Sequence, residues 1–289
     1  MIRNLLFIST ITFLSSSLLG LTFSFTGSGL PAMRQFFIAS LSGAALITAL
    51  LQLGFAFFCF VGGLLGGIYR KEKILSLGCF LLFLAALFLG VSLNLTVNLL
   101  IMTIMGIGCG LIFISSNSFI IQLYPAKRGT FLNIHHLFFG FGSLIGPLIM
   151  SSVLSKGLLW QIPYKGLGLF ALLVSVCLLL ILPNRKDVKR SGLSQLDLNG
   201  IRKLFTNGDF RTVMLVAFLS IGIQFTLMYL IVTYLHGEKG LSITHSGIML
   251  SLFFVLLALG RIICALLALK LKNSRISRRT PYQGTCFSN

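Results

Sequence analysis

Polar side chains recur on one face of an apolar segment in the last third of the chain. Gly222, Thr226, Tyr229 and Thr233 are spaced by four, three and four residues, so they share one face of an α-helix. Hydroxyl-rich ligands are held by neutral donors and acceptors beside an aromatic ring, and Gln224 and Tyr229 offer both. The stripe equally suits hydrogen bonds between packed helices, worth about 0.5–2 kcal/mol each. Both interpretations stay open.

A second polar group lies in the apolar segment Leu99 to Leu123. Asn117 is uncommon at membrane depth because its amide needs partners in hydrocarbon, so it lines a cavity or bonds to a neighbouring helix. Hydroxyls in the first apolar segment are expected to bond to their own helix backbone instead. These are Thr10, Thr12, Ser15, Ser16 and Ser17.

Two kinds of titratable or charged residue fall inside apolar segments. His135 and His136 begin one turn into the segment Phe131 to Val153, where an imidazole can relay protons or simply pack at the interface. Adjacent residues point to different helix faces, so a metal site formed by both is not expected. Arg261 lies ~13 Å along the helix from the nearer end of its segment, which makes it a candidate gate or packing anchor.

Acidic residues are absent from every apolar segment. All five lie in expected loops: Glu72, Asp187, Asp197, Asp209 and Glu238. Proton symport normally uses an intramembrane carboxylate, so coupling here would fall to a histidine or be lost. No carboxylate pair, Ser/His/Asp set, metal cluster or phosphate-binding loop is recognisable, and the six cysteines are scattered without a C-x-x-C. We therefore expect no enzyme activity, no metal and no cofactor.

The elements that must position these residues are transmembrane helices. Hydrophobic residues make up 56% of the chain and charged residues 10%, which excludes a soluble globular domain. Eight segments are long enough to cross a bilayer, at ~20 residues each. They are Leu5 to Phe25, Leu41 to Leu65, Ile74 to Ser92, Leu99 to Leu123, Phe131 to Val153, Leu167 to Leu182, Val213 to Leu235 and Gly247 to Leu269. The prediction is an all-α polytopic membrane protein.

Basic residues fix the orientation of these spans. Of 23 Lys and Arg, eighteen lie on the side of the N-terminus, four on the other side, and Arg261 within a span. Short cytoplasmic loops retain positive charge, so both termini are expected in the cytoplasm and the plasma (inner) membrane is the expected location. The net charge of +18 is then topological, and nucleic acid is not an expected partner. A cleaved signal peptide at the first segment is the alternative, but no A-x-A site is present.

Composition also divides the chain into four parts. Residues 1–182 hold six spans with short connections, and residues 183–211 form a basic cytoplasmic linker. Residues 212–270 hold two more spans, and 271–289 form a polar tail with no further apolar run. Six spans, a long basic loop and more spans is the arrangement of transporters built from two six-span halves around a central cavity. We therefore expect one complete bundle and an incomplete second one, a C-terminally truncated transporter.

Glycines at helical spacing indicate close helix packing. Two G-x-x-x-G pairs, Gly62/Gly66 and Gly63/Gly67, precede a basic turn, and this region resembles the major facilitator signature G-x-x-x-D-R-x-G-R-R with Gly67 at the aspartate position.

A third glycine pair lies further along the chain, in the apolar segment Phe131 to Val153. Gly142 and Gly146 share a helix face, and Pro147 frees a backbone carbonyl. This G-x-x-x-G-P run resembles the fifth-span signature of facilitator transporters.

Two further stretches resemble the fucose permease branch of that superfamily, whose members are mostly proton-coupled sugar symporters. One is L-N-x-x-H-x-F-F-G, which contains Asn133 and His136 and begins at Leu132; the other runs from Gly222 to Leu235 and on to Gly260 and Arg261. The resemblance implies a helical bundle that moves a small polar solute, a sugar by preference, by alternating access, with protons as the coupling ion. Taken together with the polar residues described above, it makes Asn117, Asn133, Gln224, Thr226, Tyr229 and Thr233 the candidate substrate contacts, and His135, His136 and Arg261 the candidates for gating or coupling; Gln224 and Tyr229 stand where family members usually carry glutamate and tryptophan. A nontransporting remnant or membrane scaffold subunit is the alternative.

Overall fold

The computed structural model describes residues 2–181 and 205–271, with backbone only at residues 2–5, 181, 261, 262 and 264–271. Helices and short turns account for all of this part of the chain, which contains no strand. In order they are α1 (Ile2–Phe36), α2 (Leu41–Ile68), α3 (Lys71–Phe88), α4 (Leu95–Leu123), the short 3-10 helix η1 (Pro125–Lys127), α5 (Arg128–Ser155), α6 (Gln161–Ile181), α8 (Gly208–Gly237) and α9 (Ile243–Leu271).

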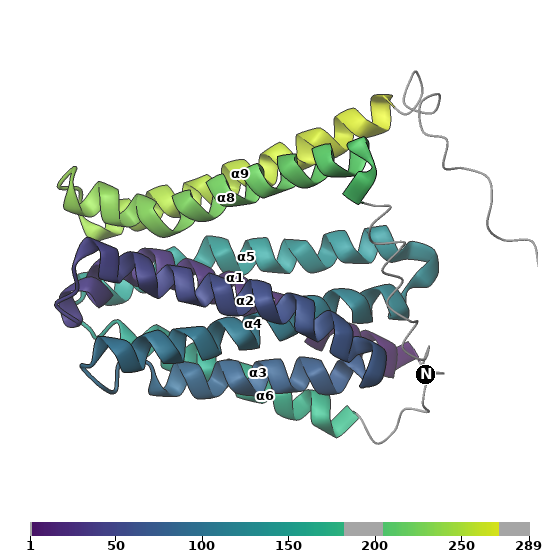
Figure 1. The fold of residues 1–289 in the computed structure, drawn as a ribbon, viewed down its shortest axis with the longest axis horizontal. Helices are drawn as coiled ribbons and strands as arrows, with labels where there is room; N and C mark the ends of the chain where they lie inside the picture. The colour runs from purple at the N-terminus through teal and green to yellow at the C-terminus, as the bar shows by residue number, and fades with distance from the viewer. Residues whose placement is uncertain (1, 182–204, 272–289) are drawn as a thin grey trace, which may run out of the picture.

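Helices α1 to α6 form one bundle, and α8 and α9 form a hairpin against it (Figure 1). In the bundle α2 packs on α4, α1 on α5, and α3 on both α4 and α6, while α8 lies on α1 and α9 on α5. Seven described helices are long and apolar enough to cross a membrane. The remaining predicted span, Ile74 to Ser92, corresponds to α3, which begins with the charged run Lys71, Glu72 and Lys73 and runs alongside the others. The predicted all-helical membrane fold is confirmed.

The first helix is longer than the sequence predicts. We expected the span to end at Phe25, yet α1 continues to Phe36 and includes Pro31. The intervening hydroxyls bond within the helix, Thr26 to the Thr22 carbonyl at 2.9 Å and Ser28 to the Ser24 carbonyl at 2.7 Å. Because these polar groups are satisfied locally, the helix can stay buried where composition suggested a loop.

Glycines let the bundle helices meet backbone to backbone. A Cβ added to Gly54 of α2 would lie 2.5 Å from the Thr103 carbonyl of α4, and one on Gly110 of α4 would lie 2.5 Å from the Phe55 carbonyl of α2. Neither fits, so both positions require the missing side chain.

The glycine pair expected to pack closely on α5 does so. Gly142 and Gly146 of α5 lie against α1, where an added Cβ would come within 3.1 Å of the Leu21 nitrogen and 3.0 Å of the Ser24 Cβ. Pro147, which follows them, is buried within α5.

On α2 the close contact is limited to one of the four expected positions. A Cβ on Gly62 would meet the Ile114 side chain at 2.7 Å, and one on Gly63 would meet it only at 3.8 Å. Around Gly66 and Gly67 nothing described lies within 4 Å. The last turn of α2 is exposed at Gly67 and Ile68, so the close packing expected there is not found.

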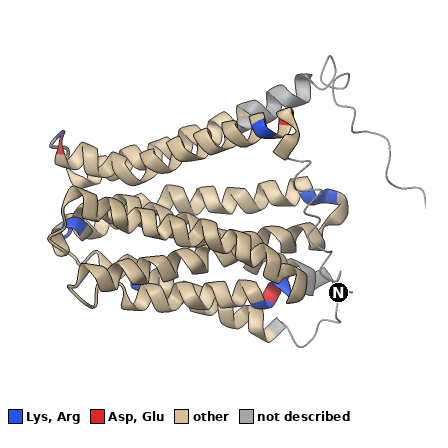
Figure 2. Cartoon of the chain, viewed as in Figure 1, with Lys and Arg blue, Asp and Glu red and all other residues tan. Residues whose placement is uncertain are grey.

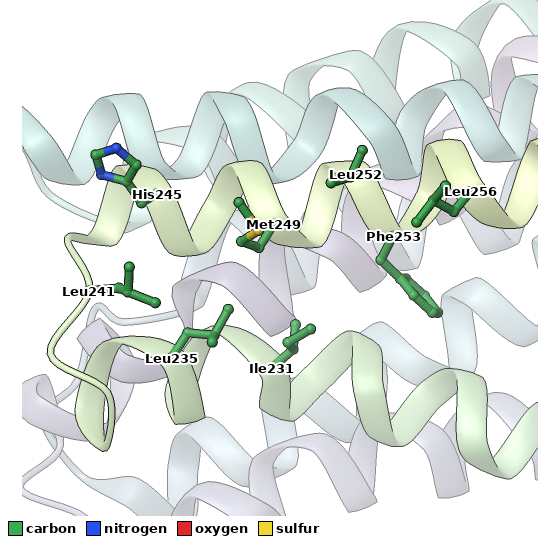
Figure 3. Close-up of a pocket in the computed structure, with 8 residues that line it drawn as sticks. All are labelled: Ile231, Leu235, Leu241, His245, Met249, Leu252, Phe253 and Leu256. Carbon is green, nitrogen blue, oxygen red and sulfur yellow. The ribbon is translucent and has the colours of Figure 1, made fainter.

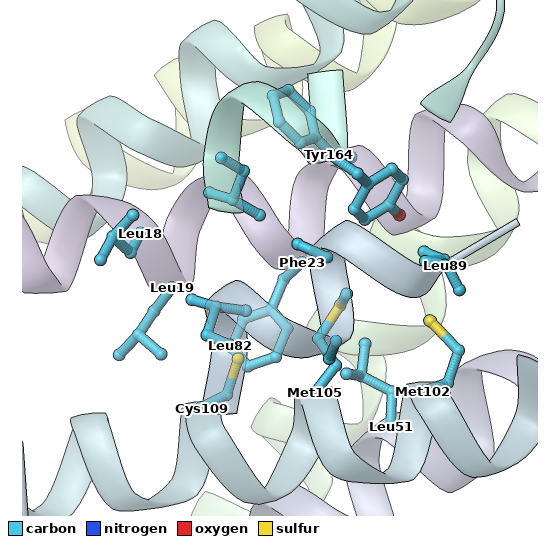
Figure 4. Close-up of a cluster of buried hydrophobic side chains, with 14 of the residues drawn as sticks. Leu18, Leu19, Phe23, Leu51, Leu82, Leu89, Met102, Met105, Cys109 and Tyr164 are labelled. Carbon is cyan, nitrogen blue, oxygen red and sulfur yellow. The ribbon is translucent and has the colours of Figure 1, made fainter. Parts of the chain in front are cut away.

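The core lies where α1 meets α2, α3, α4 and α6 (Figure 4). Large side chains on these helices are fully buried. The cysteines whose side chains are described, Cys59, Cys79, Cys109 and Cys177, are free thiols. The labelled members are Leu18, Leu19, Phe23, Leu51, Leu82, Leu89, Met102, Met105, Cys109 and Tyr164. Polar contacts also cross the bundle, among them one between the Thr26 and Tyr164 hydroxyls at 3.1 Å and one between the Ser76 and Ser175 hydroxyls at 2.9 Å.

Described charged side chains lie at the two ends of the helices (Figure 2). From the helix bounds, the end near the N-terminus holds Arg70, Lys71, Glu72, Lys73, Lys127, Arg128, Asp209 and Arg211, and the opposite end holds Arg34, Lys156, Lys165, Glu238 and Lys239. Between these ends the described side chains carry no formal charge at neutral pH, as a bilayer interior requires.

Candidate functional site

Tyr229 of α8 and Gln52 of α2 meet where the hairpin contacts the bundle. The Gln52 Nε2 donates a hydrogen bond to the Tyr229 hydroxyl at 2.8 Å, although the residues are 177 positions apart. Tyr229 is 4% exposed and Gln52 is half-buried. The contact joins the two parts of the fold through a neutral amide and a phenol.

Aromatic rings continue this contact into the bundle. Tyr229 stacks on Phe225 with centroids 5.9 Å apart, and Phe225 meets Phe23 of α1 edge to face at 5.5 Å. Phe23 in turn meets Phe55 of α2 edge to face at 5.3 Å. Phe55 lies one turn from Gln52, so the rings and the hydrogen bond close a circuit through α8, α1 and α2.

The aromatic series extends to α4 and α5. Phe55 lies 5.5 Å from Phe113, and Phe113 lies 6.4 Å from the ring of His136. On the next turn of α4, the Asn117 Nδ2 donates to the Phe113 carbonyl at 2.9 Å, while its Oδ1 is buried without a described partner. One acceptor of Asn117 therefore remains free for another donor.

Of the predicted polar stripe on α8, only Tyr229 is buried against the bundle. Thr226 is exposed, Gln224 is half-buried, and Gly222 has open space around it. Thr233 is half-buried, and its hydroxyl oxygen is enclosed without a described partner. The stripe is therefore one continuous helix face that is packed only in its second half.

The α5 candidates lie in three different environments. His135 is fully buried beside Phe13 at 6.3 Å, and neither of its ring nitrogens has a described hydrogen-bond partner. His136 is half-buried and faces Phe113, whereas Asn133 is exposed. The structure thus brings His136 and Asn117 to the same aromatic series and places Asn133 elsewhere. Arg261 falls in α9 where only backbone is described.

Three of the five α1 hydroxyls singled out in the sequence bond to their own helix, as predicted. Thr10 donates to the Leu6 carbonyl, Thr12 to Ile8, and Ser15 to Thr12, all within 2.9 Å. Ser17 differs, because it donates to the Phe138 carbonyl of α5 at 3.1 Å. Of these groups, Ser17 therefore joins α1 to α5, and the other three are satisfied within α1.

Charge at the basic turn between α2 and α3 is partly neutralised. Arg70 and Glu72 form an ion pair at 3.7 Å, and the Lys71 Nζ donates to the Ser118 carbonyl of α4 at 3.3 Å. Burial lowers the pKa of Lys71, and the neighbouring Glu72 opposes that shift. The turn is therefore attached to the end of α4.

An apolar groove of about 390 Å³ lies between α8 and α9, away from these residues (Figure 3). Its walls are Ile231, Leu235, Leu241, His245, Met249, Leu252, Phe253 and Leu256. None of the predicted substrate contacts lines it. No group of three or more potential metal ligands occurs among the described residues.

Sequence reasoning missed Gln52 and the phenylalanines that accompany it. A signal for Gln52 was available, since it is the one amide in the segment Leu41 to Leu65 and an amide at membrane depth requires partners. The phenylalanines gave no such signal, because the chain contains 27 of them.

The described part of the chain is a helical bundle with an uncharged interior, and a helical hairpin contacts it through amide and aromatic groups. This is the architecture of an integral membrane protein of the transporter class. Residues 12–287 match the family model "Major Facilitator Superfamily", and the chain belongs to that superfamily.

Two curated relatives are similar to parts of the chain. Major facilitator superfamily domain-containing protein 4A of Xenopus tropicalis is 37% identical over 106 residues, which are 34% of this chain and 21% of that protein. Protein TsgA homolog of Buchnera aphidicola subsp. Baizongia pistaciae (strain Bp) is 26% identical over 172 residues, 59% of this chain and 44% of that protein. The chain thus matches less than half the length of either relative.

Two solved structures share the fold. A bacterial homologue of the human lysosomal transporter Spinster, in an inward-facing and unoccupied conformation, aligns with a TM-score of 0.63 and 20% identity over 93% of this chain and 62% of that one. A D-xylose-proton symporter aligns with a TM-score of 0.62 and 17% identity over 92% of this chain and 69% of that one. At these identities the likeness describes the fold alone.

Proposed function

We propose that this protein moves a small neutral polar solute, with a sugar as the candidate, across the plasma (inner) membrane by alternating access. The observation that carries the proposal is the amide–aromatic circuit of Gln52, Tyr229, Phe225 and Phe23 at the junction of the hairpin and the bundle. Such a junction is where superfamily transporters place their sites. Half-buried Gln224, on α8 with Tyr229, and the free acceptor of Asn117, on helix α4 of the bundle, supply further uncharged hydrogen-bonding groups.

Protons are the proposed coupling ion, with His135 and His136 as the candidate carriers. No described carboxylate lies within a span: Glu72 and Asp209 occupy first helical turns and Glu238 caps α8. Within the described bundle, the imidazoles are the remaining side chains of a type that can carry a proton at a physiological pH in water.

Uptake by proteoliposomes containing the 289-residue chain tests the proposal. Labelled fucose, glucose and galactose are offered with and without an inward proton gradient. We expect one sugar to accumulate, and Gln224→Leu to lower its uptake about tenfold, since a lost polar contact of ~1.4 kcal/mol has that effect. Gln122→Leu is the matched control, because Gln122 is exposed at the end of α4.

A second candidate is a nontransporting scaffold subunit or remnant, and one observation favours it. In the most apolar stretch of α1, 72% of the residues are buried, whereas in the most apolar stretch of α8 only 17% are buried. The proposed division is a complete bundle (1–182), a linker (183–211) and two further helices (212–270). Because α8 is so little covered, the described helices of these parts do not enclose a cavity. Folded protein that accumulates none of the sugars supports this candidate.

A further inference from the structure

Helix α8 is attached to the bundle over a short stretch. Its described buried residues are Met228, Tyr229 and Val232, within little more than one turn. Towards its beginning, Val213 and Phe218 are 68% and 74% exposed. Figure 1 shows the same arrangement: the α8–α9 hairpin touches the bundle at the end away from the N-terminus and diverges from it towards the other.

At this attachment the main chain of α8 is fixed by a glycine. A Cβ on Gly27 of α1 would collide with the Met228 carbonyl oxygen and would lie 3.3 Å from the Tyr229 Cα. The two backbones are therefore in direct contact, without side chains between them.

The side chain of Tyr229 adds the polar part of the attachment. Its hydroxyl accepts a hydrogen bond from the Gln52 amide at 2.8 Å, and Gln52 comes from α2, a different helix from the one that fixes the backbone. If α8 moved away, a phenol and an amide would both lose this bond at membrane depth. The bond therefore favours the state in which this end is closed.

We propose that Gln52 is a positioning residue: its hydrogen bond to Tyr229 holds the α8–α9 hairpin closed against the bundle at this end, and its loss opens that end. The inference rests on the alternating-access function proposed above only in assuming that the hairpin moves. It assigns to α2 a role in the closure between α1 and α8.

Thiol labelling in lipid nanodiscs, where both faces are accessible, tests the proposal without any substrate. Val232→Cys places a reporter at a buried position one turn after Tyr229, and Ser246→Cys, buried on α9, is the second reporter. We expect Gln52→Leu to raise the maleimide labelling rate of either reporter about three- to tenfold, the effect of one lost hydrogen bond. Tyr229→Phe, which keeps the ring, should do the same.

Controls separate local opening from general loosening. The double variant Gln52→Leu with Tyr229→Phe should label no faster than either single variant, because both remove one bond. Gln122→Leu should leave the labelling rate of the reporters unchanged. The native Cys79, which is fully buried in α3, should label at the same rate in every variant. Unchanged reporter labelling in Gln52→Leu, effects that multiply in the double variant, or faster labelling of Cys79 would each overturn the inference. Failure of sugar uptake would not, since labelling requires no transport.

Discussion

His135 is a buried imidazole whose two ring nitrogens have no described partner. It lies on the α5 face that packs against Phe13, and none of its side chain is exposed. A buried polar group without a hydrogen bond costs about 1–3 kcal/mol, so this residue lowers the stability of the bundle.

Replacing His135 by leucine should therefore stabilise the protein. We expect the free energy of unfolding to rise by about 1–3 kcal/mol, seen as a higher Tm in detergent. His136→Leu is the matched control and should not raise Tm, because His136 is half-buried and has interactions of its own. A lower Tm for His135→Leu would mean that the ring nitrogens are bonded in solution.

At this scale the sequence identified some residues and not their partners. The spacing that singles out Tyr229 is local, and a hydroxyl on an aromatic ring in a span requires a partner. That the partner is Gln52 depends on how α2 and α8 are placed, and nothing in a single sequence relates residues 177 apart. The same holds for Asn117, whose free acceptor follows from what surrounds it.

The interface between α1 and α5 illustrates how elements are held together. Gly20 and Gly142 each lie against the opposite backbone, and Ser17 of α1 donates to the Phe138 carbonyl of α5. In lipid, where apolar surface gives no drive to associate, such close approach is the main source of helix packing energy.

Gly142→Ala should destabilise this interface. The added methyl would collide with the Ser17 carbonyl and lie 3.1 Å from the Leu21 nitrogen, and overpacking of this kind costs about 1–3 kcal/mol. Gly140→Ala on the same helix has nothing within 4 Å and should be neutral or stabilise by up to about 1 kcal/mol. Thermal unfolding in detergent distinguishes the two, and equal Tm values would contradict the proposed contact.

Helix positions followed from apolar length, whereas helix ends did not. Each predicted span overlaps an observed helix, because ~20 apolar residues leave little other choice in a bilayer. The end of α1 was placed eleven residues too early because Thr26 and Ser28 look like loop residues until their bonds to the backbone are known. The exposed last turn of α2 could not be foreseen either, since exposure depends on where α4 lies.

Over the whole molecule, charge marks two faces. The end near the N-terminus has the denser basic residues among those described, and the rule for cytoplasmic loops predicts that this end is the cytoplasmic face. The cytoplasmic termini remain a proposal that this asymmetry supports.

Single cysteines at the two ends test this orientation in intact cells. A membrane-impermeant maleimide should label Lys156→Cys, which follows α5, and should leave Arg128→Cys, which begins α5, unlabelled until the membrane is permeabilised. The parent chain serves as the blank for native thiols. Labelling in the opposite order would reverse the orientation.

The arrangement of the hairpin was the least predictable feature at this scale. Apolar patterning predicts that α8 and α9 span the membrane and is silent on which bundle helices they contact. That α8 rests on α1 and α9 on α5 depends on small residues such as Gly27 and Gly247, which have no distinctive sequence context.

The hydroxyl-rich helix α1 has a consequence for how the chain is made. It is the least apolar of the seven candidate spans and the most buried, yet it leaves the ribosome before the helices that bury it. Because Thr12, Thr22 and Ser24 donate to carbonyls of their own helix, the segment can enter the lipid alone with those groups satisfied. Ser17, whose acceptor lies on α5, must wait until that helix has been synthesised. Biogenesis thus has an early step that α1 completes by itself and a later one in which it docks.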